Sequence, residues 1–146
     1  TDVSYIANDG TFNGTATSAN WSDLAEKYLA DRGYEHGDLL AVGGEKEVTL
    51  YKKGMAIAGI ISTRPGVRMN VNEDNMEDPL WPFIALKGRI PCKINGTAQK
   101  GDYIVADDNG KCKALPADTT AAMRMNFLNF VGVALEDGEG LVEVKV

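Results

Sequence analysis

Few side chains in this sequence could do chemistry at a protein site, and their spacing does not match the sites that such residues usually build. His36 is the single imidazole and lies in the polar sequence YEHGD, with no Ser or Cys beside it, so a catalytic triad is not predicted. The segment NVNEDNMEDP, residues 70–79, lacks the alternating ligands and central glycine of a calcium loop. Its four carboxylates are Glu73, Asp74, Glu77 and Asp78. We interpret it as a solvated surface loop.

The two cysteines, Cys92 and Cys112, do not indicate a metal site. They stand 20 residues apart without a CxxC motif, in a chain with one histidine, so zinc-ligand spacing is absent. Two separate thiols in apolar strands, or a disulfide between neighbouring strands, both agree with this spacing. The glycines of GGEK, residues 43–46, fit the tip of a hairpin and not a phosphate-binding loop. We therefore expect no metal and no cofactor.

Length and charge narrow the class of protein. A chain of 146 residues with 44% hydrophobic content is enough for one domain with its own core. The net charge of −6 and the lack of clustered Lys and Arg argue against nucleic-acid binding. No apolar run approaches the roughly 20 residues that span a bilayer, and Thr1 begins no secretory leader. We expect neither membrane insertion nor a nucleic-acid partner.

After residue 37 the sequence predicts mostly β-structure, because its apolar stretches are short, rich in Val and Ile, and bounded by turn residues. VADDNGKCKAL, residues 105–115, predicts a hairpin, since Asn109 and Gly110 can both take positive φ. EDGEG, residues 136–140, predicts a second turn. The expected strands are Leu39–Val42, Glu47–Tyr51, Met55–Ser62, Trp81–Lys87, Arg89–Ile94, Tyr103–Ala106, Lys111–Leu115, Phe130–Leu135 and Leu141–Val146.

Two segments could be helical. TTAAMRMNF, residues 119–127, has Thr119 as a possible N-cap, and SDLAEKYLADRG, residues 22–33, has Ser22 as a cap and Gly33 as a stop. In the second segment the apolar and polar residues also alternate, so a strand competes with the helix. Both alternatives stay open for this segment.

An internal repeat is the most informative pattern. HGDLLAVGGEKEVTLY, residues 36–51, aligns with KGDYIVADDNGKCKAL, residues 100–115, and AIAGIIS and NFVGVAL follow them as a second matching pair. Two such copies predict a compact β-barrel or clip-like domain with a pseudo-twofold repeat. Glycine inside the strands at Gly59 and Gly132 indicates a bulge or a close backbone approach.

The first 20 residues differ from the rest of the chain. Residues 5–19, YIANDGTFNGTATSA, are nearly free of charge and rich in small polar residues, so they cannot bury enough surface to fold alone. Such a tract suits a narrow stalk shared by several chains. We predict an extended stalk-like segment over residues 1–20 and a β-rich terminal domain over residues 21–146.

Five stretches carry a resemblance to a known family. FNGTATSANWSDLAEKYLAD, GDLLAVGGEKEVTL, IAGIISTRPGVRMN, LKGRIPCKINGTAQKGDYIVA and VGVALEDGEGLVEVKV resemble, in this order, the C-terminal domain of phage tail-fibre and related virion fibre proteins. The resemblance covers residues 11–146. It implies a long upstream fibre, a trimeric β-rich organisation, and a place in the virion after synthesis in the host cytoplasm.

The chain is also similar, more distantly, to G2-type intramolecular chaperone domains, which assist trimerisation and then release themselves by autocleavage at a serine. Residues 23–26, Asp-Leu-Ala-Glu, match the family's Asp-aromatic-Ala-Glu run, with leucine in place of the aromatic residue. Neither Ser18 nor Ser22 has the serine spacing of the cleaving members. The resemblance implies Ser18 as the first nucleophile to test, with Asp23 or Glu26 moving the proton. The ordinary alternatives are that Ser18 is a residue of the stalk and that Ser22 is a cap or turn residue.

We expect a non-enzymatic terminal module of a viral fibre, a homo-trimer that brings three chains into register so that the upstream shaft can assemble. The one activity that the resemblance suggests is serine-dependent self-cleavage. A further alternative is recognition of a host surface receptor by the exposed loop RPGVRMNVNEDNMEDP, residues 64–79. Trp81 and Phe83 fit either a ridge against a partner chain or a strand of the core.

Overall fold

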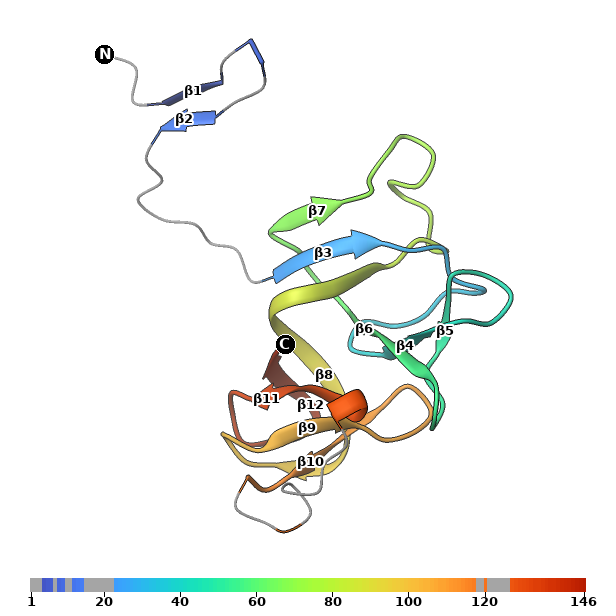
Figure 1. The fold of residues 1–146 in the computed structure, drawn as a ribbon, viewed down its shortest axis with the longest axis vertical. Helices are drawn as coiled ribbons and strands as arrows, with labels where there is room; N and C mark the ends of the chain where they lie inside the picture. The colour runs from blue at the N-terminus through green and yellow to red at the C-terminus, as the bar shows by residue number, and fades with distance from the viewer. Residues whose placement is uncertain (1–3, 7, 10–11, 15–22, 118–119, 121–126) are drawn as a thin grey trace.

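In the computed structural model the described residues are 4–6, 8–9, 12–14, 23–117, 120 and 127–146 (Figure 1). About half of the described residues lie in strands and almost none in a helix, which confirms the predicted mainly-β class. β1 (Ser4–Ile6) and β2 (Phe12–Gly14) form a separate antiparallel pair within the segment predicted to be stalk-like. Most of that segment, and most of the helix predicted over residues 119–127, lie outside the described residues.

The remaining strands form one ten-stranded sheet, in which one long strand is shared by two halves. The shared strand is β8 (Phe83–Ala98), which runs through the two segments predicted as separate strands because Gly88, at φ 124°, continues the chain between them. The first half contains β3 (Asp23–Lys27), β4 (Leu39–Val42), β5 (Val48–Leu50), β6 (Ala56–Ile61) and β7 (Val67–Met69). The second contains β9 (Tyr103–Ala106), β10 (Cys112–Leu115), the 3-10 helix η1 (Phe127–Asn129), β11 (Phe130–Ala134) and β12 (Gly138–Lys145). For residues 22–33, which left helix and strand open, the structure has a strand at β3.

Each half pairs its own strands in the same order. In the second half the order β10-β9-β11-β12-β8 closes into a five-stranded barrel, because β10 also pairs with β8 in parallel at Cys112 and Ile94. In the first half the order is β5-β4-β6-β8-β3, and a parallel bridge between Ala30 and Val48 occupies the closing position. The two closing contacts lie 64 positions apart in the sequence, so the first half has the same plan as the barrel.

The strand registers confirm the predicted repeat. β4 pairs Leu40 with Gly59 of β6, and β9 pairs Ile104 with Gly132 of β11, and both ladders contain a bulge next to the glycine. The turns before β4 and β9 also match, since the amide of Glu35 donates to the Asp38 carboxylate at 2.9 Å and that of Gln99 to Asp102 at 2.8 Å. These two aspartates therefore cap turns.

The two halves differ by two insertions. Ile61 and Ile84 are paired neighbours 23 positions apart, whereas their counterparts Ala134 and Val144 are only 10 positions apart. The first half thus carries 13 extra residues within 62–83, which we call the insertion. It includes β7 and the acidic loop, residues 70–79. The second half carries 9 extra residues between β10 and β11, because the offset between copies rises there from 64 to 73.

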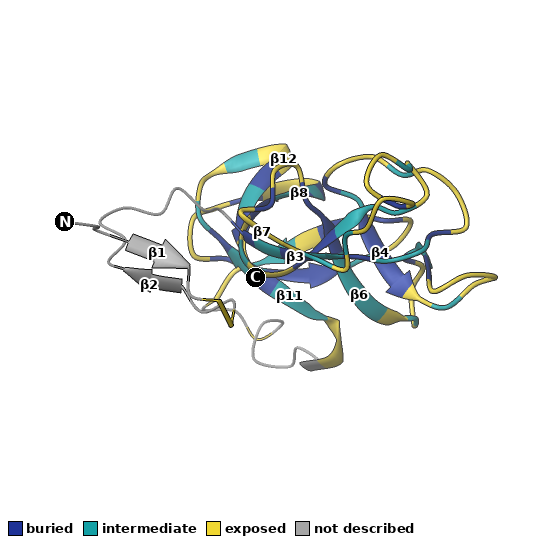
Figure 2. Cartoon of the chain, turned by 90° about the horizontal axis from the view of Figure 1, so that it is seen from above, coloured by how far each residue is buried: buried dark blue, intermediate teal, exposed yellow. Residues whose placement is uncertain are grey.

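Each half has a core built from equivalent positions, and Figure 2 shows the buried strands enclosed by exposed loops. The smaller cluster contains Ala30, Leu40, Val48, Ile61 and Ile84, and each of its residues is at most 2% exposed. Their counterparts all belong to the larger cluster: Ile94, Ile104, Cys112, Ala134 and Val144. Full burial of a side chain such as Leu or Ile contributes about 1.5–3 kcal/mol, so both clusters stabilise the fold substantially.

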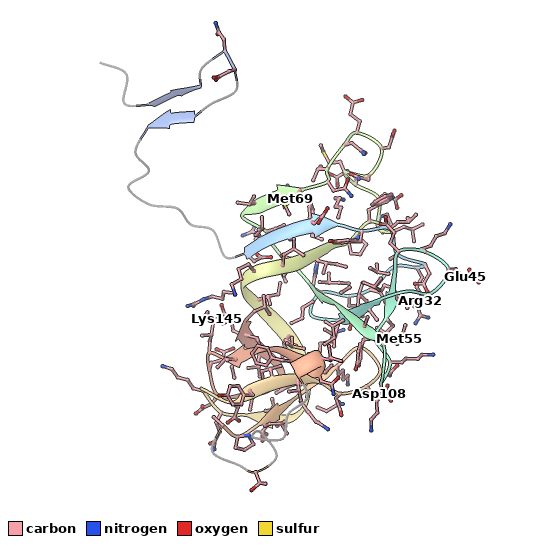
Figure 3. The ribbon with its side chains drawn as sticks, viewed as in Figure 1. Arg32, Glu45, Met55, Met69, Asp108 and Lys145 are labelled. Atoms are coloured by element: carbon pink, nitrogen blue, oxygen red, sulfur yellow. The ribbon has the colours of Figure 1, made fainter. Side chains whose placement is uncertain are left out.

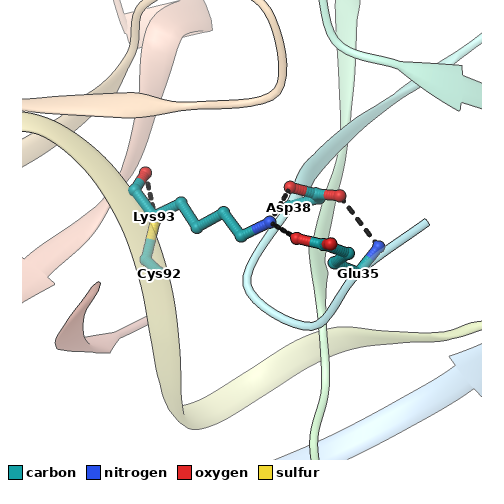
Figure 4. Close-up of polar contacts among 4 residues, drawn as sticks. All are labelled: Glu35, Asp38, Cys92 and Lys93. Atoms are coloured by element: carbon teal, nitrogen blue, oxygen red, sulfur yellow. Dashed lines mark hydrogen bonds and ion pairs between the residues drawn. The ribbon is translucent and has the colours of Figure 1, made fainter. Parts of the chain in front are cut away.

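The halves are joined by a polar contact between β8 and the turn before β4 (Figure 4). The Lys93 ammonium donates to the carboxylates of Glu35 at 2.6 Å and Asp38 at 2.7 Å, and the Lys93 amide donates to the carbonyl of Gly37 at 3.0 Å. Partial burial acts to lower the pKa of Lys93, but the bonds from both carboxylates outweigh burial and raise this pKa. The contact therefore holds a charged lysine at the junction.

Both cysteines are free thiols buried in the barrel, so the structure has the first of the two alternatives that the sequence left open. Cys92 and Cys112 nevertheless lie next to each other. The hydrogen-bonding contact with Cys92, together with burial, raises the pKa of the Cys112 thiol well above its ordinary value. The neutral thiol is the stable form there.

Candidate functional site

The structure describes two of the four residues suggested for self-cleavage. Ser18 and Ser22 lie outside the described residues. Asp23 is the first residue of β3 and is 5% exposed, whereas Glu26 is half-buried and accepts a hydrogen bond from the Tyr28 hydroxyl at 2.8 Å. Residues three apart on a strand point to opposite faces. Asp23 and Glu26 therefore do not face one common point.

One face of β3 is buried although it carries charge. Asp23, Ala25 and Lys27 alternate with less buried residues, and β7 of the insertion pairs with β3 in parallel. At the equivalent positions of the second half, β8 carries the exposed residues Lys87 and Arg89. Since the copy without the insertion leaves these positions open to solvent, the insertion accounts for the burial of this face.

Lys27 attaches the insertion to β3 of the first half. Its ammonium donates to the carbonyl oxygens of Asn75 and Met76, the latter at 3.0 Å, and lies 4.8 Å from the ring centroid of Phe83. Burial lowers the pKa of Lys27, and the nearby carboxylates of Glu77 and Asp78 act in the opposite direction. A buried ammonium is tolerated only with such partners, so Lys27 and the loop depend on each other.

The acidic loop is folded around a buried asparagine. Asn75 is 2% exposed; its carboxamide oxygen accepts from the amide of Asn72 at 2.9 Å, and its carboxamide nitrogen donates to the carbonyl of Asn70 at 2.9 Å. Glu73, Asp74 and Glu77 are exposed, as expected for a solvated loop. Among the described residues, no group of three or more His, Cys, Asp or Glu side chains is placed to hold a metal ion.

A cleft of about 460 Å³ lies where the insertion meets the strands of the first half. Its wall includes Lys27 of β3, the turn 33–36, the end of β6 and the segment 76–83. His36 has its Nδ1 atom 2.9 Å from the carbonyl oxygen of Ser62. The hydroxyl of Ser62 is itself buried and has no hydrogen-bond partner in the described part of the chain. Half-buried Trp81 also lines the cleft, which places it at a surface of the domain and outside the core strands.

A second surface feature is apolar and lies along β6 and β11. Two neighbouring grooves of about 620 and 200 Å³ share Ile57 and Phe130 in their walls. Leu128 is 77% exposed beside them. Met55, which lines the larger groove, is labelled in Figure 3 near Asp108, where the two halves meet. We call the grooves together the apolar surface; its other apolar side chains are Leu86, Val131 and Val146.

Sequence reasoning did not find the roles of Lys27 and Ser62 or the cleft. No motif marks them, because they are brought together from segments up to 56 positions apart. One signal was present: the copy of the repeat that contains Trp81 is longer than the other between β6 and β8. An insertion into one copy of a repeat is a natural place for a site, since the rest of the copy is used for folding.

Among the described residues, no helix is both long and apolar enough to cross a bilayer.

No family model and no curated protein matches the chain. Two solved structures share its fold. Pre-mature gene product 12 of bacteriophage phi29 matches with a TM-score of 0.63 and 17% identity, over 94% of this chain and 23% of that one. A C-terminal fragment of gene product 12 matches with a TM-score of 0.56 and 18% identity, over 85% of this chain and 99% of the fragment. The chain therefore has the fold found in this C-terminal fragment, and it spans about a quarter of the pre-mature protein.

Proposed function

We propose that the domain is the terminal structural module of a phage fibre protein, in which three copies associate and hold the upstream chains in register. The match to nearly all of the gene product 12 C-terminal fragment supports a place at the end of a longer phage chain. In this proposal the module is made in the host cytoplasm and ends in the virion. Its partners are two further copies of itself and the upstream shaft.

The physical reason for such a module is entropic. Each residue of a disordered tract loses about 1–2 kcal/mol of conformational free energy when its backbone is fixed. Three tracts that are joined at one folded end have an effective concentration of about the millimolar range, so their assembly no longer depends on random encounter. The tract before β3 has a composition to which this reasoning applies, since it is rich in Gly, Thr, Asn and Ala.

The apolar surface along β6 and β11 is the observation that carries the proposal. Ile57 and Phe130 line both of its grooves, and Leu128 beside them is 77% exposed. Exposed apolar side chains that gather at one place on a surface are typical of protein–protein interfaces. Ile57 and Phe130 hold equivalent positions in the repeat, so each half contributes one of the two residues that both grooves share.

The test is the mass of the particle in solution, measured by light scattering across a range of concentrations. The wild-type chain is expected at three times the monomer mass. Leu128→Lys places a charge on the apolar surface and is expected to weaken association at least about tenfold. The matched control is Leu141→Lys, an exposed leucine on β12 that is 55% exposed and lies outside both grooves.

A wild-type chain that stays monomeric at every concentration would refute the proposal. Equal weakening by Leu128→Lys and Leu141→Lys would instead exclude the apolar surface as the interface. Circular dichroism of both variants verifies that they remain folded.

Self-cleavage is a second candidate, which the burial of Asp23 favours. Asp23 follows the two serines closely in the sequence, and a buried carboxyl is a group that can move a proton during attack on a neighbouring peptide. The hydroxyl oxygen of Ser18 would bond to the carbonyl carbon of Thr17 and pass its proton to the carboxylate. The C–N bond then breaks, the amine receives the proton, and one water molecule hydrolyses the ester.

Intact mass tests this candidate in a chain with upstream sequence attached. Cleavage gives two fragments whose masses add up to the chain plus one water. Ser18→Ala and Asp23→Asn should each leave a single full-length mass, and Glu26→Gln is the control on the other face of β3. If Ser22→Ala alone blocks cleavage, Ser22 is the nucleophile. A full-length mass for the wild-type chain removes the candidate.

A further inference from the structure

We infer that the cleft beside β3 binds a neutral saccharide unit, with Trp81 as the surface on which the sugar ring stacks. This inference goes beyond the assembly role and does not depend on it, because the cleft and the apolar surface share no residue. It gives a specific form to the expectation that the segment 64–79 contacts a receptor. The ligand would lie between this insertion and the strands of the first half.

The aromatic residues and the histidine that line the cleft are not repeated in the second half. By the repeat offsets, Tyr34 corresponds to Ala98, and His36 corresponds to Lys100. By the offset of 60 that aligns Ile84 with Val144, Trp81 corresponds to Leu141. The second half closes its barrel without an aromatic residue or histidine at these positions. The cleft is thus an addition to a complete folding plan.

Trp81 is the aromatic residue of the cleft with a ring available for a ligand. The guanidinium of Arg68 lies 5.6 Å from the ring centroid of Phe83, and that of Arg32 lies 5.1 Å from the ring centroid of Tyr34. In the described part of the chain, Trp81 has no such contact, and its side chain is half-buried in the wall. A large, rigid ring with one polar N–H suits a ligand that has both an apolar face and hydroxyl groups.

Polar groups around this ring match the hydroxyl edge of a sugar. The Nδ1–H of His36 donates to the Ser62 carbonyl, which leaves Nε2 of the neutral ring as an acceptor. The carboxylate of Asp78 uses one oxygen to accept from the Leu80 amide at 2.8 Å. The hydroxyl of Ser62, a residue of the cleft wall, is buried and has no hydrogen-bond partner among the described residues, and a ligand hydroxyl that reached it would supply one.

The charges of the cleft favour a ligand without net charge. Glu77 and Asp78 lie in the wall and would repel an anionic sugar. They also lie near the buried ammonium of Lys27, whose positive charge opposes a cationic ligand. A hexose or N-acetylhexosamine therefore fits better than a uronic acid or a quaternary ammonium compound.

The experiment is a titration of the folded chain with methyl glycosides of glucose, galactose, N-acetylglucosamine and N-acetylgalactosamine. The sequence has two tryptophans, so Trp21→Phe leaves Trp81 as the single fluorescent reporter. At least one glycoside should change this fluorescence in a saturable way. Methyl glucuronide and choline are the charged probes, and both should bind more weakly. Calorimetric titration of the wild-type chain checks that Trp21→Phe does not itself change the affinity.

Three variants test the residues. Trp81→Ala should weaken binding by at least about tenfold, and Trp81→Phe should retain part of it. Ser62→Ala should weaken binding up to about tenfold while the midpoint of thermal unfolding stays equal or rises, since a buried unpaired hydroxyl is removed. Leu141→Ala, outside the cleft, is the matched control and should bind as the wild type does.

The inference is wrong if none of the four glycosides binds saturably, if choline or the glucuronide binds best, or if Trp81→Ala binds like the control. The oligomeric state of Trp81→Ala is measured in parallel. If the chain is monomeric and still binds the glycoside through Trp81, the assembly proposal fails alone. If the chain is trimeric and binds no glycoside, the present inference fails alone.

Discussion

Replacing Gly132 with alanine is expected to destabilise the domain strongly, because the strand next to it leaves no room for a methyl group. A Cβ atom built at Gly132 would meet the carbonyl oxygen of Lys145 and would lie 2.7 Å from Cγ1 of Val144. The first of these neighbours is backbone of β12, which is held in the ladder by the pairing of Val133 with Lys145. It cannot rotate away as a flexible side chain could.

The cost follows from this geometry. Overpacking of a filled core costs about 1–3 kcal/mol, and the upper end applies where backbone must move. For a domain of this size, each kcal/mol lowers the midpoint of thermal unfolding by roughly 2–4 °C. We therefore expect Gly132→Ala to unfold about 6–12 °C below the wild type in calorimetry. Gly59→Ala should behave alike, since its built Cβ lies 2.7 Å from Cγ2 of Ile84 and 2.8 Å from the Ala85 carbonyl, the equivalent neighbours.

Gly33 supplies the matched control. It has no atom within 4 Å of a built Cβ and no positive φ, so Gly33→Ala should leave stability unchanged or raise it by about 0.4–1 kcal/mol. The reasoning is refuted if Gly132→Ala unfolds at the wild-type temperature. It is also refuted if all three variants lose the same stability, because the loss would then be a general effect of alanine in this fold.

Three further outcomes test other contacts. Lys93→Met should lower the free energy of unfolding by about 1–2 kcal/mol in urea titration, a value reduced for partial exposure, and no change would exclude the contact between the halves. Lys93 lowers the pKa of Glu35, so ionised Glu35 stabilises the fold above its unfolded pKa. The difference in unfolding free energy between wild type and Lys93→Met should therefore shrink as the pH falls below about 4.3 and the carboxyl takes up its proton. A difference that stays constant with pH would contradict this. The raised pKa and burial of Cys112 beside Cys92 predict that Ellman's reagent labels the thiols only after unfolding, so fast labelling of native protein would be contradictory. Lys27→Met should speed amide exchange in residues 70–78 about tenfold with little change in the barrel, and uniform exchange would speak against its local role.

Much of the sheet could be predicted, because local turn chemistry fixes it. β4 and β9 have the predicted bounds, and Asn109 and Gly110 both take positive φ, at 50° and 73°. The predicted turn at EDGEG differs in detail: Gly138 already begins β12, and Gly140, at φ 71°, lies at a bulge within that strand. A glycine with positive φ fits both a turn and a bulge, so the sequence does not decide between them.

The candidate site could not be predicted in the same way. Lys27 looks like a solvent-facing residue of a strand, and only the packing of a distant loop buries it. Trp81, between two prolines, was equally compatible with a strand of the core or a ridge. Long-range placement of side chains from four segments is set by tertiary packing, which alternation and turn signals do not encode.

The length of β8 has a consequence for how the molecule comes apart. Its 16 residues pair with strands of both halves, so neither half can open without taking a neighbouring strand away from the other. Two duplicated units that are joined by a linker would melt in separate steps, but two that have a strand in common are expected to melt in one. Tension applied at either end of the domain would then be resisted by both halves together, a property that suits the terminal fibre module proposed above.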